Sequence, residues 1–342
     1  MTLKKNGVER PVIDQVSPFA AIPGGEIAVR GHGFVRATHP KVTFGGMPAS
    51  LVVSSDSYVV ARVPDGARRG SLVIHNGDQD SSAVDVKVGI PLADNLHPVT
   101  NPAVDAAGNI YVTFSGSRGQ KSPVALFEIE PGGTISPYLT EMMNPTALAF
   151  DAAGVLHVSS RFDGVVYQVP EHEERQVYVE GMGVATGLAF DRSGNLYVGD
   201  RSGTVFKVGP QRQIYVFATM EPSIAAYHFA IGPDDYLYAS GPTTSSFDTV
   251  NRISPQGEVE VFYRGVGRPQ GLAFDDAGNL YVAASLAGRK GIVKITPARE
   301  ASIFLTGPNI VGLAFTPARQ MVVATTNAVY RVDVNIAGRP LP

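Results

Sequence analysis

Cysteine is absent from this sequence of 342 residues, which excludes disulfide bridges, thiolate zinc sites and a cysteine nucleophile. Charged residues are scarce at 17%, against roughly 25% in a typical soluble domain. The formal net charge of −3 argues against nucleic acid or an anionic membrane as a partner. No apolar run reaches the roughly 18 residues that a membrane span requires, so none is expected.

Helical periodicity of useful length is also missing, whereas glycine (37 residues) and proline (25) are plentiful. This balance favours many short strands joined by tight turns. Zinc-protease, serine-hydrolase, P-loop and dinucleotide-binding motifs do not occur. The first 16 residues contain lysines but no apolar segment, so a cytoplasmic location is expected, with an exported form left open.

One sequence unit recurs six times after about residue 97, and its most similar copies are GLAFDRSGNLYV (187–198) and GLAFDDAGNLYV (271–282). Equivalent turn positions follow one another at steps of 40 to 46 residues, at Asp105, Asp151, Asp191, Gly232, Asp275 and Thr316. Four short strands in each step predict a six-bladed β-propeller. The last unit lacks a good fourth strand, and we expect segment 85–95 to supply it and close the ring.

Residues 11–88 follow another pattern, with about seven short alternating strands between turns, which predicts a small β-sandwich. This region resembles the IPT/TIG immunoglobulin-like domain through Pro11, Ile13, Pro18, Gly24, Gly25, Gly31, Gly33, Phe34, the run 44–46, Val63 and Pro64. Residues 89–342 resemble the NHL-repeat and SMP-30/gluconolactonase-like propellers through the repeated PxGLAFDxxGNLYV pattern. The predicted fold is therefore all-β, an immunoglobulin-like sandwich followed by a six-bladed propeller.

The resemblance to SMP-30-like enzymes implies a divalent cation in the central channel, held by Glu, Asn and Asp side chains just before the Gly-Leu pair. The corresponding residues here are Thr100, Thr146, Thr186, Tyr227, Gln270 and Val311. None is a carboxylate or an asparagine, although a hard cation such as Ca²⁺ prefers carboxylate oxygens. We therefore expect no cofactor, with a divalent cation such as Ca²⁺ left open as an alternative that lacks its expected ligands.

The repeated D-x-x-G-N turn has two interpretations. Its Asp and Asn residues resemble calcium ligands, but the distant glutamate of an EF-hand-type loop is missing. A structural role explains each residue, since Asp bonds backbone amides, Gly adopts positive φ and Asn tolerates the turn exit. The structural interpretation is favoured.

Breaks in the repeat mark the candidate site. His228 replaces the repeated glycine, and with Tyr227 it is a candidate catalytic pair, or else a hydrogen-bonded block in the channel. Asp200 follows a strand where other copies carry small or neutral residues, beside Arg201, as an ion pair or a ligand anchor. The remaining candidate ligand-binding residues are Arg161, Arg268, Asn101, Gln270 and Thr186.

Two function classes remain open. The first is a non-catalytic binding or scaffold protein that recognises a protein, carbohydrate or other small-molecule ligand. The second, suggested by the SMP-30/gluconolactonase resemblance, is a hydrolase or lyase acting on a lactone or sugar derivative in the channel. The missing carboxylates favour binding, while His228 keeps catalysis under consideration.

Overall fold

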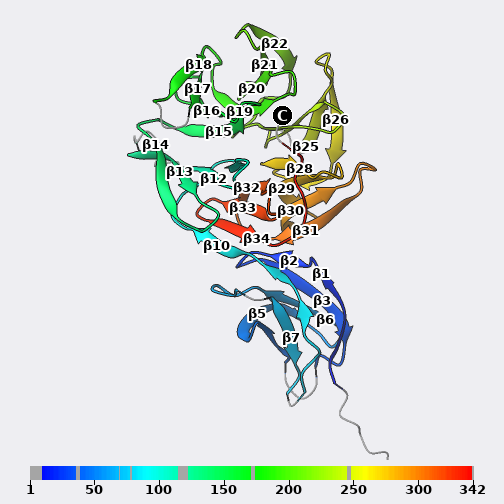
Figure 1. Ribbon diagram of the computed structural model, residues 1–342. Helices are drawn as coiled ribbons and strands as arrows, with labels where there is room; N and C mark the ends of the chain where they lie inside the picture. The colour runs from blue at the N-terminus through cyan, green and yellow to red at the C-terminus, as the bar shows by residue number, and fades with distance from the viewer. Residues whose placement is uncertain are drawn as a thin grey trace, which may run out of the picture. The chain divides into compact units, whose positions relative to one another are not determined.

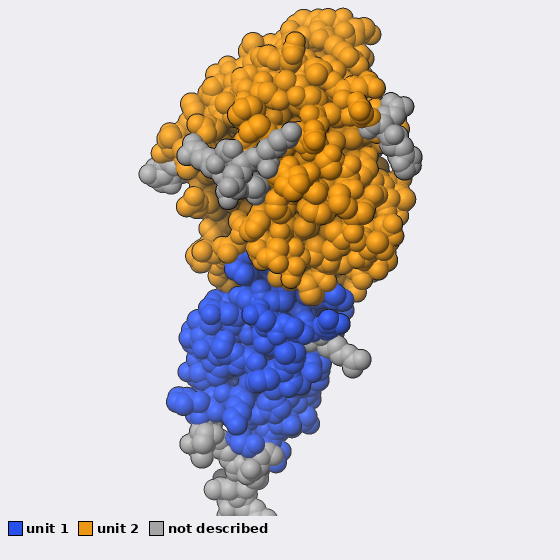
Figure 2. All heavy atoms as spheres, turned by 90° about the vertical axis from the view of Figure 1, so that its left-hand side faces the viewer, with its two compact units in different colours: residues 1–90, 303–308 blue, residues 91–302, 309–342 orange. Residues whose placement is uncertain are grey.

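The structure is a computed structural model that describes residues 10–35, 39–68, 70–77, 79–114, 122–170, 174–244 and 248–340. Regular elements in these ranges are all β-strands, and they include no helix long and apolar enough to cross a membrane. The prediction of an all-β chain is confirmed. Figure 2 colours its two compact units: unit 1 comprises residues 1–90 and 303–308, and unit 2 comprises 91–302 and 309–342.

Unit 1 is built on a seven-stranded sheet whose two halves share one core. In spatial order its strands are β1 (Val12–Ser17), β3 (Glu26–His32), β6 (Tyr58–Arg62), β5 (Met47–Ser54), β4 (Lys41–Phe44), β7 (Ser71–His75) and β8 (Val84–Asp85). Ile27 and Val59 from one half bury against the same cluster as Val42 and Leu72 from the other. Because both halves contribute to one core, the unit packs as a small sandwich.

A second, parallel pairing lies at the margin of unit 1. Strand β2 (Ala20–Ala21) pairs with β9 (Lys87–Val88) and with β31 (Ala301–Thr306), where Ala21 lies opposite Thr306. The Thr306 hydroxyl also donates to Glu26 O (2.8 Å). These bonds explain why residues 303–308 group with unit 1, although the sequence pattern assigns them to the second region.

The described part of unit 2 contains five four-stranded sheets. The first four, in spatial order, are β11 (Ala103–Val104), β12 (Ile110–Thr113), β13 (Val124–Ile129), β14 (Ile135–Thr140); β15 (Pro145–Phe150), β16 (Leu156–Ser160), β17 (Val165–Val169), β18 (Gln176–Val179); β19 (Ala185–Phe190), β20 (Leu196–Asp200), β21 (Thr204–Val208), β22 (Ile214–Thr219); β23 (His228–Ile231), β24 (Leu237–Ser240), β25 (Thr249–Ile253), β26 (Val259–Arg264). The fifth is β10 (Ile90–Ala93), β34 (Val329–Val332), β33 (Met321–Thr325), β32 (Ile310–Phe315).

The repeat copy at 270–285 departs from the expected six sheets of four strands. Strands β27 (Val266–Gly267) and β28 (Leu272–Phe274) both pair with β29 (Leu280–Leu286), which pairs in turn with β30 (Arg289–Ile295). β28 has only three residues because Gly271 N donates to Val311 O (3.0 Å) on another inner strand. The expected four-stranded sheet is therefore found five times among the described residues.

The innermost strands lie around a common centre in Figure 1. Each contacts the next in a circuit that runs β11, β15, β19, β23, β28, β32 and back to β11. Neighbouring sheets also share cores: Ala147 of β15 and Leu188 of β19 bury in one cluster. Unit 2 is thus propeller-like, and we call the space between these six inner strands the central channel.

The D-x-x-G-N turns hold the inner hairpins together. In the copy at 191–197, Asp191 Oδ1 accepts from Asn195 N (2.9 Å), and Asp191 Oδ2 accepts from Asn195 Nδ2 (2.8 Å) and the Tyr197 hydroxyl (3.2 Å). Gly194 has φ +77°, a conformation that favours glycine. The copies at Asp105 and Asp275 repeat the carboxylate bonds. The structural interpretation of this motif is confirmed.

Candidate functional site

The threonines at the implied metal-ligand positions are engaged in hydrogen bonds within the fold. Thr186 is fully buried, and its hydroxyl donates to Gly199 O (2.8 Å) and accepts from Tyr227 N (3.3 Å). The Thr146 hydroxyl donates to Asn144 O (3.2 Å). The described residues contain no group of three or more His, Cys, Asp and Glu side chains able to hold a metal. This donor set does not fit a hard divalent cation.

His228, the first residue of β23, forms a hydrogen bond across the channel. Its Nδ1 lies 3.2 Å from the Thr100 hydroxyl, which precedes β11, and both residues are buried. Two inner strands separate β11 from β23 in either direction around the circuit, so this bond joins opposite sides. Burial lowers the pKa of His228 to about 4, so the imidazole is neutral at pH 7.

Tyr227 is held in the same layer but is turned to other partners. Its hydroxyl donates to the Glu221 carbonyl, and its ring stacks on Phe229 with centroids 6.2 Å apart. Burial, reinforced by the charge of Glu221, raises the pKa of Tyr227 to about 12. The phenol therefore stays protonated at neutral pH.

Asn101 joins two further inner strands in this layer. Its Nδ2 donates to Leu272 O (2.8 Å), and its Oδ1 accepts from Leu313 N (3.0 Å). Gly312 packs so tightly that an added Cβ would lie 2.5 Å from the Asn101 backbone N and Cα. Gln270 N donates to Ala283 O (2.8 Å), and the Gln270 carbonyl accepts from the Ser240 hydroxyl. The strands approach one another too closely here to leave an open centre.

Asp200 organises a loop. Its Oδ1 accepts from Val184 N (3.2 Å) and Ser202 N (3.1 Å), and its Oδ2 accepts from the Ser202 hydroxyl (2.9 Å). No ion pair links it to Arg201 among the described residues, although that pairing was one sequence interpretation. The carboxylate is occupied by amides of its own turn and the neighbouring loop.

The three candidate arginines are exposed in loops at the end of the channel where the inner strands begin. Arg161 N donates to Asn144 O (3.4 Å), and Arg201 N donates to Val184 O (3.2 Å). Arg268 N donates to Asp248 Oδ2 (2.8 Å). The structure thus brings Thr186 together with Tyr227, and Thr100 together with His228, while Arg201 and Arg268 form no described bond to that buried group.

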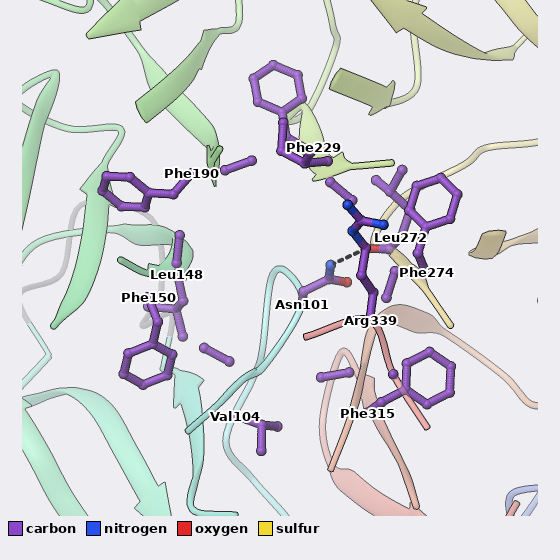
Figure 3. A pocket seen from close by; sticks show the side chains of 18 of the residues that line it. Asn101, Val104, Leu148, Phe150, Phe190, Phe229, Leu272, Phe274, Phe315 and Arg339 are labelled. Atoms are coloured by element: carbon purple, nitrogen blue, oxygen red, sulfur yellow. Dashed lines mark hydrogen bonds between the residues drawn. The ribbon is translucent and has the colours of Figure 1, made fainter. Parts of the chain in front are cut away.

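At the other end of the same strands lies a cavity of about 230 Å³, which sequence reasoning missed. Figure 3 shows its apolar walls around Asn101 and Arg339. The walls come from residues 101–104, 148–150, 188–190, 229–231, 272–274 and 313–315, with Arg192 and the segment 338–340. The sequence signal for this cavity is the repeated Leu-Ala-Phe triplet. The same regular apolar pattern is expected of an ordinary hydrophobic core, so it does not by itself indicate a cavity.

Comparisons with known proteins show what the two regions resemble. Residues 11–88 match the family model described as the IPT/TIG domain. A search of the curated proteins finds no match. A gluconolactonase from Xanthomonas campestris is similar in fold, with TM-score 0.61, 16% identity and coverage of 75% of this chain and 90% of that one.

Two other solved structures extend the comparison. A streptogramin B lyase has TM-score 0.55, 13% identity and coverage of 72% of this chain and 96% of that one. An auxiliary nutrient binding protein from Bacteroides ovatus has TM-score 0.56, 13% identity and coverage of 97% and 99%. At these identities the likeness concerns the fold: an IPT/TIG domain accompanied by a propeller-like unit of the kind seen in gluconolactonase and lyase structures.

Proposed function

We propose that this chain is a non-catalytic binding protein whose propeller-like unit, with its IPT/TIG region, recognises a carbohydrate or protein ligand. The observation that carries the proposal is the hydrogen bond between His228 and Thr100 across the channel. It occupies the layer where the enzyme resemblance requires metal ligands, and the neighbouring hydroxyls already have partners. A catalytic metal needs an open coordination position that a substrate can reach.

The proposed recognition surface is the loop face, defined as residues 161–164, 181–184, 200–203 and 221–226. Hydrogen bonds make these loops continuous: Met182 N donates to Gly164 O (3.2 Å), Val184 N to Asp200 Oδ1 (3.2 Å) and Ser223 N to Arg201 O (3.0 Å). Phe162 is 63% exposed and Ile224 is 53% exposed. Exposed apolar side chains beside arginines are typical of binding surfaces, so Arg161 and Arg201, with Arg268 at the same end, contact the ligand.

We also propose that the propeller-like unit is a closed six-bladed propeller. Strands β28, β29, β30 and β31 make the blade that departs from the regular pattern. β10, which stands beside β34 in the sheet order, supplies the outer strand of the last blade and closes the ring. Closure removes exposed sheet edges and holds the loop face in one arrangement.

Of the three solved structures described above, the one named for binding covers the largest share of this chain. The Bacteroides ovatus protein, named for nutrient binding, covers 97% of this chain, whereas the gluconolactonase and the lyase cover 75% and 72%. The likeness to the binding protein therefore includes the IPT/TIG region as well as the propeller.

The test replaces the exposed apolar side chains of the loop face. A ligand is first identified on an oligosaccharide array or by titration with candidate partner proteins. Phe162→Ser and Ile224→Ser should each weaken the binding of that ligand at least tenfold. Val216→Ser is the matched control, because Val216 is 67% exposed on β22, outside the loop face. A ligand that binds the two loop variants and the control equally would contradict the proposed surface.

The alternative is a lactone hydrolase or a lyase that uses His228. The observation that favours it is the likeness to enzymes of those classes, together with a histidine in the channel. This alternative predicts lactone hydrolysis or elimination that is lost in His228→Asn while the melting temperature persists. We expect no such activity, and a turnover sensitive to His228→Asn would overturn the binding proposal.

A further inference from the structure

The cavity at the Leu-Ala-Phe end of the channel has the size and walls of a small-molecule site. Its volume is about 230 Å³, and it is lined by Leu-Ala-Phe triplets from four inner strands together with residues of the other two. An apolar cavity of about 150 Å³ is sufficient to hold benzene. The space therefore accommodates a phenyl ring or a short aliphatic chain together with a polar group.

One positive group enters this apolar space. Figure 3 shows the Arg339 guanidinium among Asn101, Leu272 and Phe274. The Arg339 side chain is 16% exposed, and its Nη2 atom is buried with no hydrogen-bond partner. Its acidic neighbour, Asp235, is 64% exposed and its Oδ1 lies 3.8 Å from Nη2, beyond hydrogen-bonding distance. A buried donor without an acceptor is costly, so the site lacks an acceptor that an anion would supply.

A second arginine adds to the positive charge. Arg192 also lines the cavity. Burial first, and then the charge of Arg192, lower the pKa of Arg339, while Asp235 and Asp234 act in the opposite direction. The guanidinium nevertheless remains charged, because arginine does not release its proton in proteins.

The backbone around Arg339 is fixed in place. Arg339 N donates to Phe274 O (2.9 Å), and Asp276 N donates to Ala337 O (3.0 Å). Gly338 forms an isolated bridge with Asp275, and a Cβ at Gly338 would overlap the Phe315 ring. A guanidinium carried on such a fixed segment is preorganised, which lowers the entropic cost of binding.

Solvent reaches the cavity at this end. Arg192 and Pro340 both line it and are both exposed. A ligand can therefore enter with its apolar part toward the alanine and phenylalanine walls and its charged group toward the two arginines.

We propose that this cavity binds a small monocarboxylate with an apolar body, either a phenyl group or a chain of about six carbons. The planar guanidinium of Arg339 matches a carboxylate as a bidentate partner. A phosphate dianion is disfavoured, because apolar walls replace water around a larger charge. The cavity opens at the end of the inner strands that is remote from the loop face, and its charged group is Arg339, not His228, so this site goes beyond the proposed function.

The test compares acids with their amides, using calorimetry at low ionic strength. Phenylacetate and hexanoate should bind to the full chain, and phenylacetamide and hexanamide should bind at least tenfold more weakly. Arg339→Gln should reduce phenylacetate affinity at least tenfold, and Arg339→Lys severalfold, because lysine keeps the charge but loses the fork. Arg264→Gln, an exposed arginine of the same unit, should leave affinity unchanged.

Folding and location are checked separately. Arg339→Gln should keep close to the melting temperature of the parent, because its acidic neighbour Asp235 is 64% exposed and 3.8 Å away, and such an ion pair adds little stability. Ala230→Leu should weaken binding by filling the cavity. Phe162→Ser should not change phenylacetate affinity, which separates this site from the loop face. Absence of millimolar binding, equal binding of acid and amide, or full affinity in Arg339→Gln would each overturn the proposal.

Discussion

The two ends of the central channel are built from the same six inner strands, yet they differ in chemistry. Where the strands begin, His228, Thr100 and Asn101 join them by hydrogen bonds and glycine lets them nearly touch. Where they end, alanine, leucine and phenylalanine leave a cavity in which Arg339 Nη2 has no hydrogen-bond partner. A propeller channel can therefore be closed at one level and open at another, according to which residues stand at the beginning and at the end of its inner strands.

The difference teaches where to look for ligands in this fold. Buried polar groups that satisfy one another add rigidity and leave nothing for a ligand to bind. A buried polar group without a partner in an apolar cavity is an incomplete interaction, which a ligand completes. The closed end meets the first description, and the Arg339 end meets the second.

The largest effect is expected from crowding the closed end. Gly312→Ala places a methyl group 2.5 Å from the Asn101 backbone and should lower the free energy of unfolding by about 3 kcal/mol or more. Gly132→Ala is the control, since nothing lies within 4 Å of its added Cβ, and it should change stability by less than about 0.5 kcal/mol. Equal urea midpoints for the two variants would show that the strands are not in close contact.

The second largest effect is expected from lowering the pH, which should reduce the free energy of unfolding through His228 at the closed end. The pKa of His228 is about 4 in the folded state and near 6.5 when unfolded, so the unfolded chain binds more protons between these values. The free energy of unfolding therefore has its full value above pH 6.5. It falls by about 3 kcal/mol as the pH is lowered from 6.5 to 4. In urea denaturation, the free energy of unfolding of His228→Asn should therefore fall less than that of the parent over this pH range. Parallel profiles for the variant and the parent would contradict a desolvated His228.

A smaller effect is expected where the repeat itself is kept. Tyr197→Phe removes the bond to Asp191 Oδ2 and should cost about 1 kcal/mol. Tyr215→Phe, at a side chain that is 57% exposed, should cost nothing measurable by the same thermal denaturation. If both variants melt with the parent, the Asp–Tyr bonds do not stabilise the inner hairpins.

The sequence predicted features that depend on local pattern. Alternation and turn residues predicted the all-β fold, and the spacing of Asp191, Gly194 and Asn195 predicted the turn that is found. The resemblance of residues 11–88 to the IPT/TIG domain was confirmed by the family match. These features depend on residues close together in the chain.

Features that depend on distant residues were harder to predict. Thr100 and His228 are 128 residues apart, and Arg339, which lines the cavity, is held by a backbone bond to Phe274, a residue much earlier in the chain. The copy at 271–282 looks like its neighbours in sequence, yet its strand β28 has only three residues, and the Gly271 amide before it donates to Val311 O. Asp200 was singled out because it breaks the repeat, but its bonds to Val184 N and Ser202 N required coordinates.

The central claim, that the His228 end of the channel is closed and has no catalytic metal, is tested most directly by NMR titration of the His228 imidazole. With nitrogen-labelled histidine and assignment by His228→Asn, the ring should remain neutral from pH 7 down to 5, in keeping with its lowered pKa. Millimolar Ca²⁺, Zn²⁺ or Mn²⁺ should leave its resonances unchanged. A ring that titrates near 6.5, or that shifts when one of these cations is added, would contradict the account.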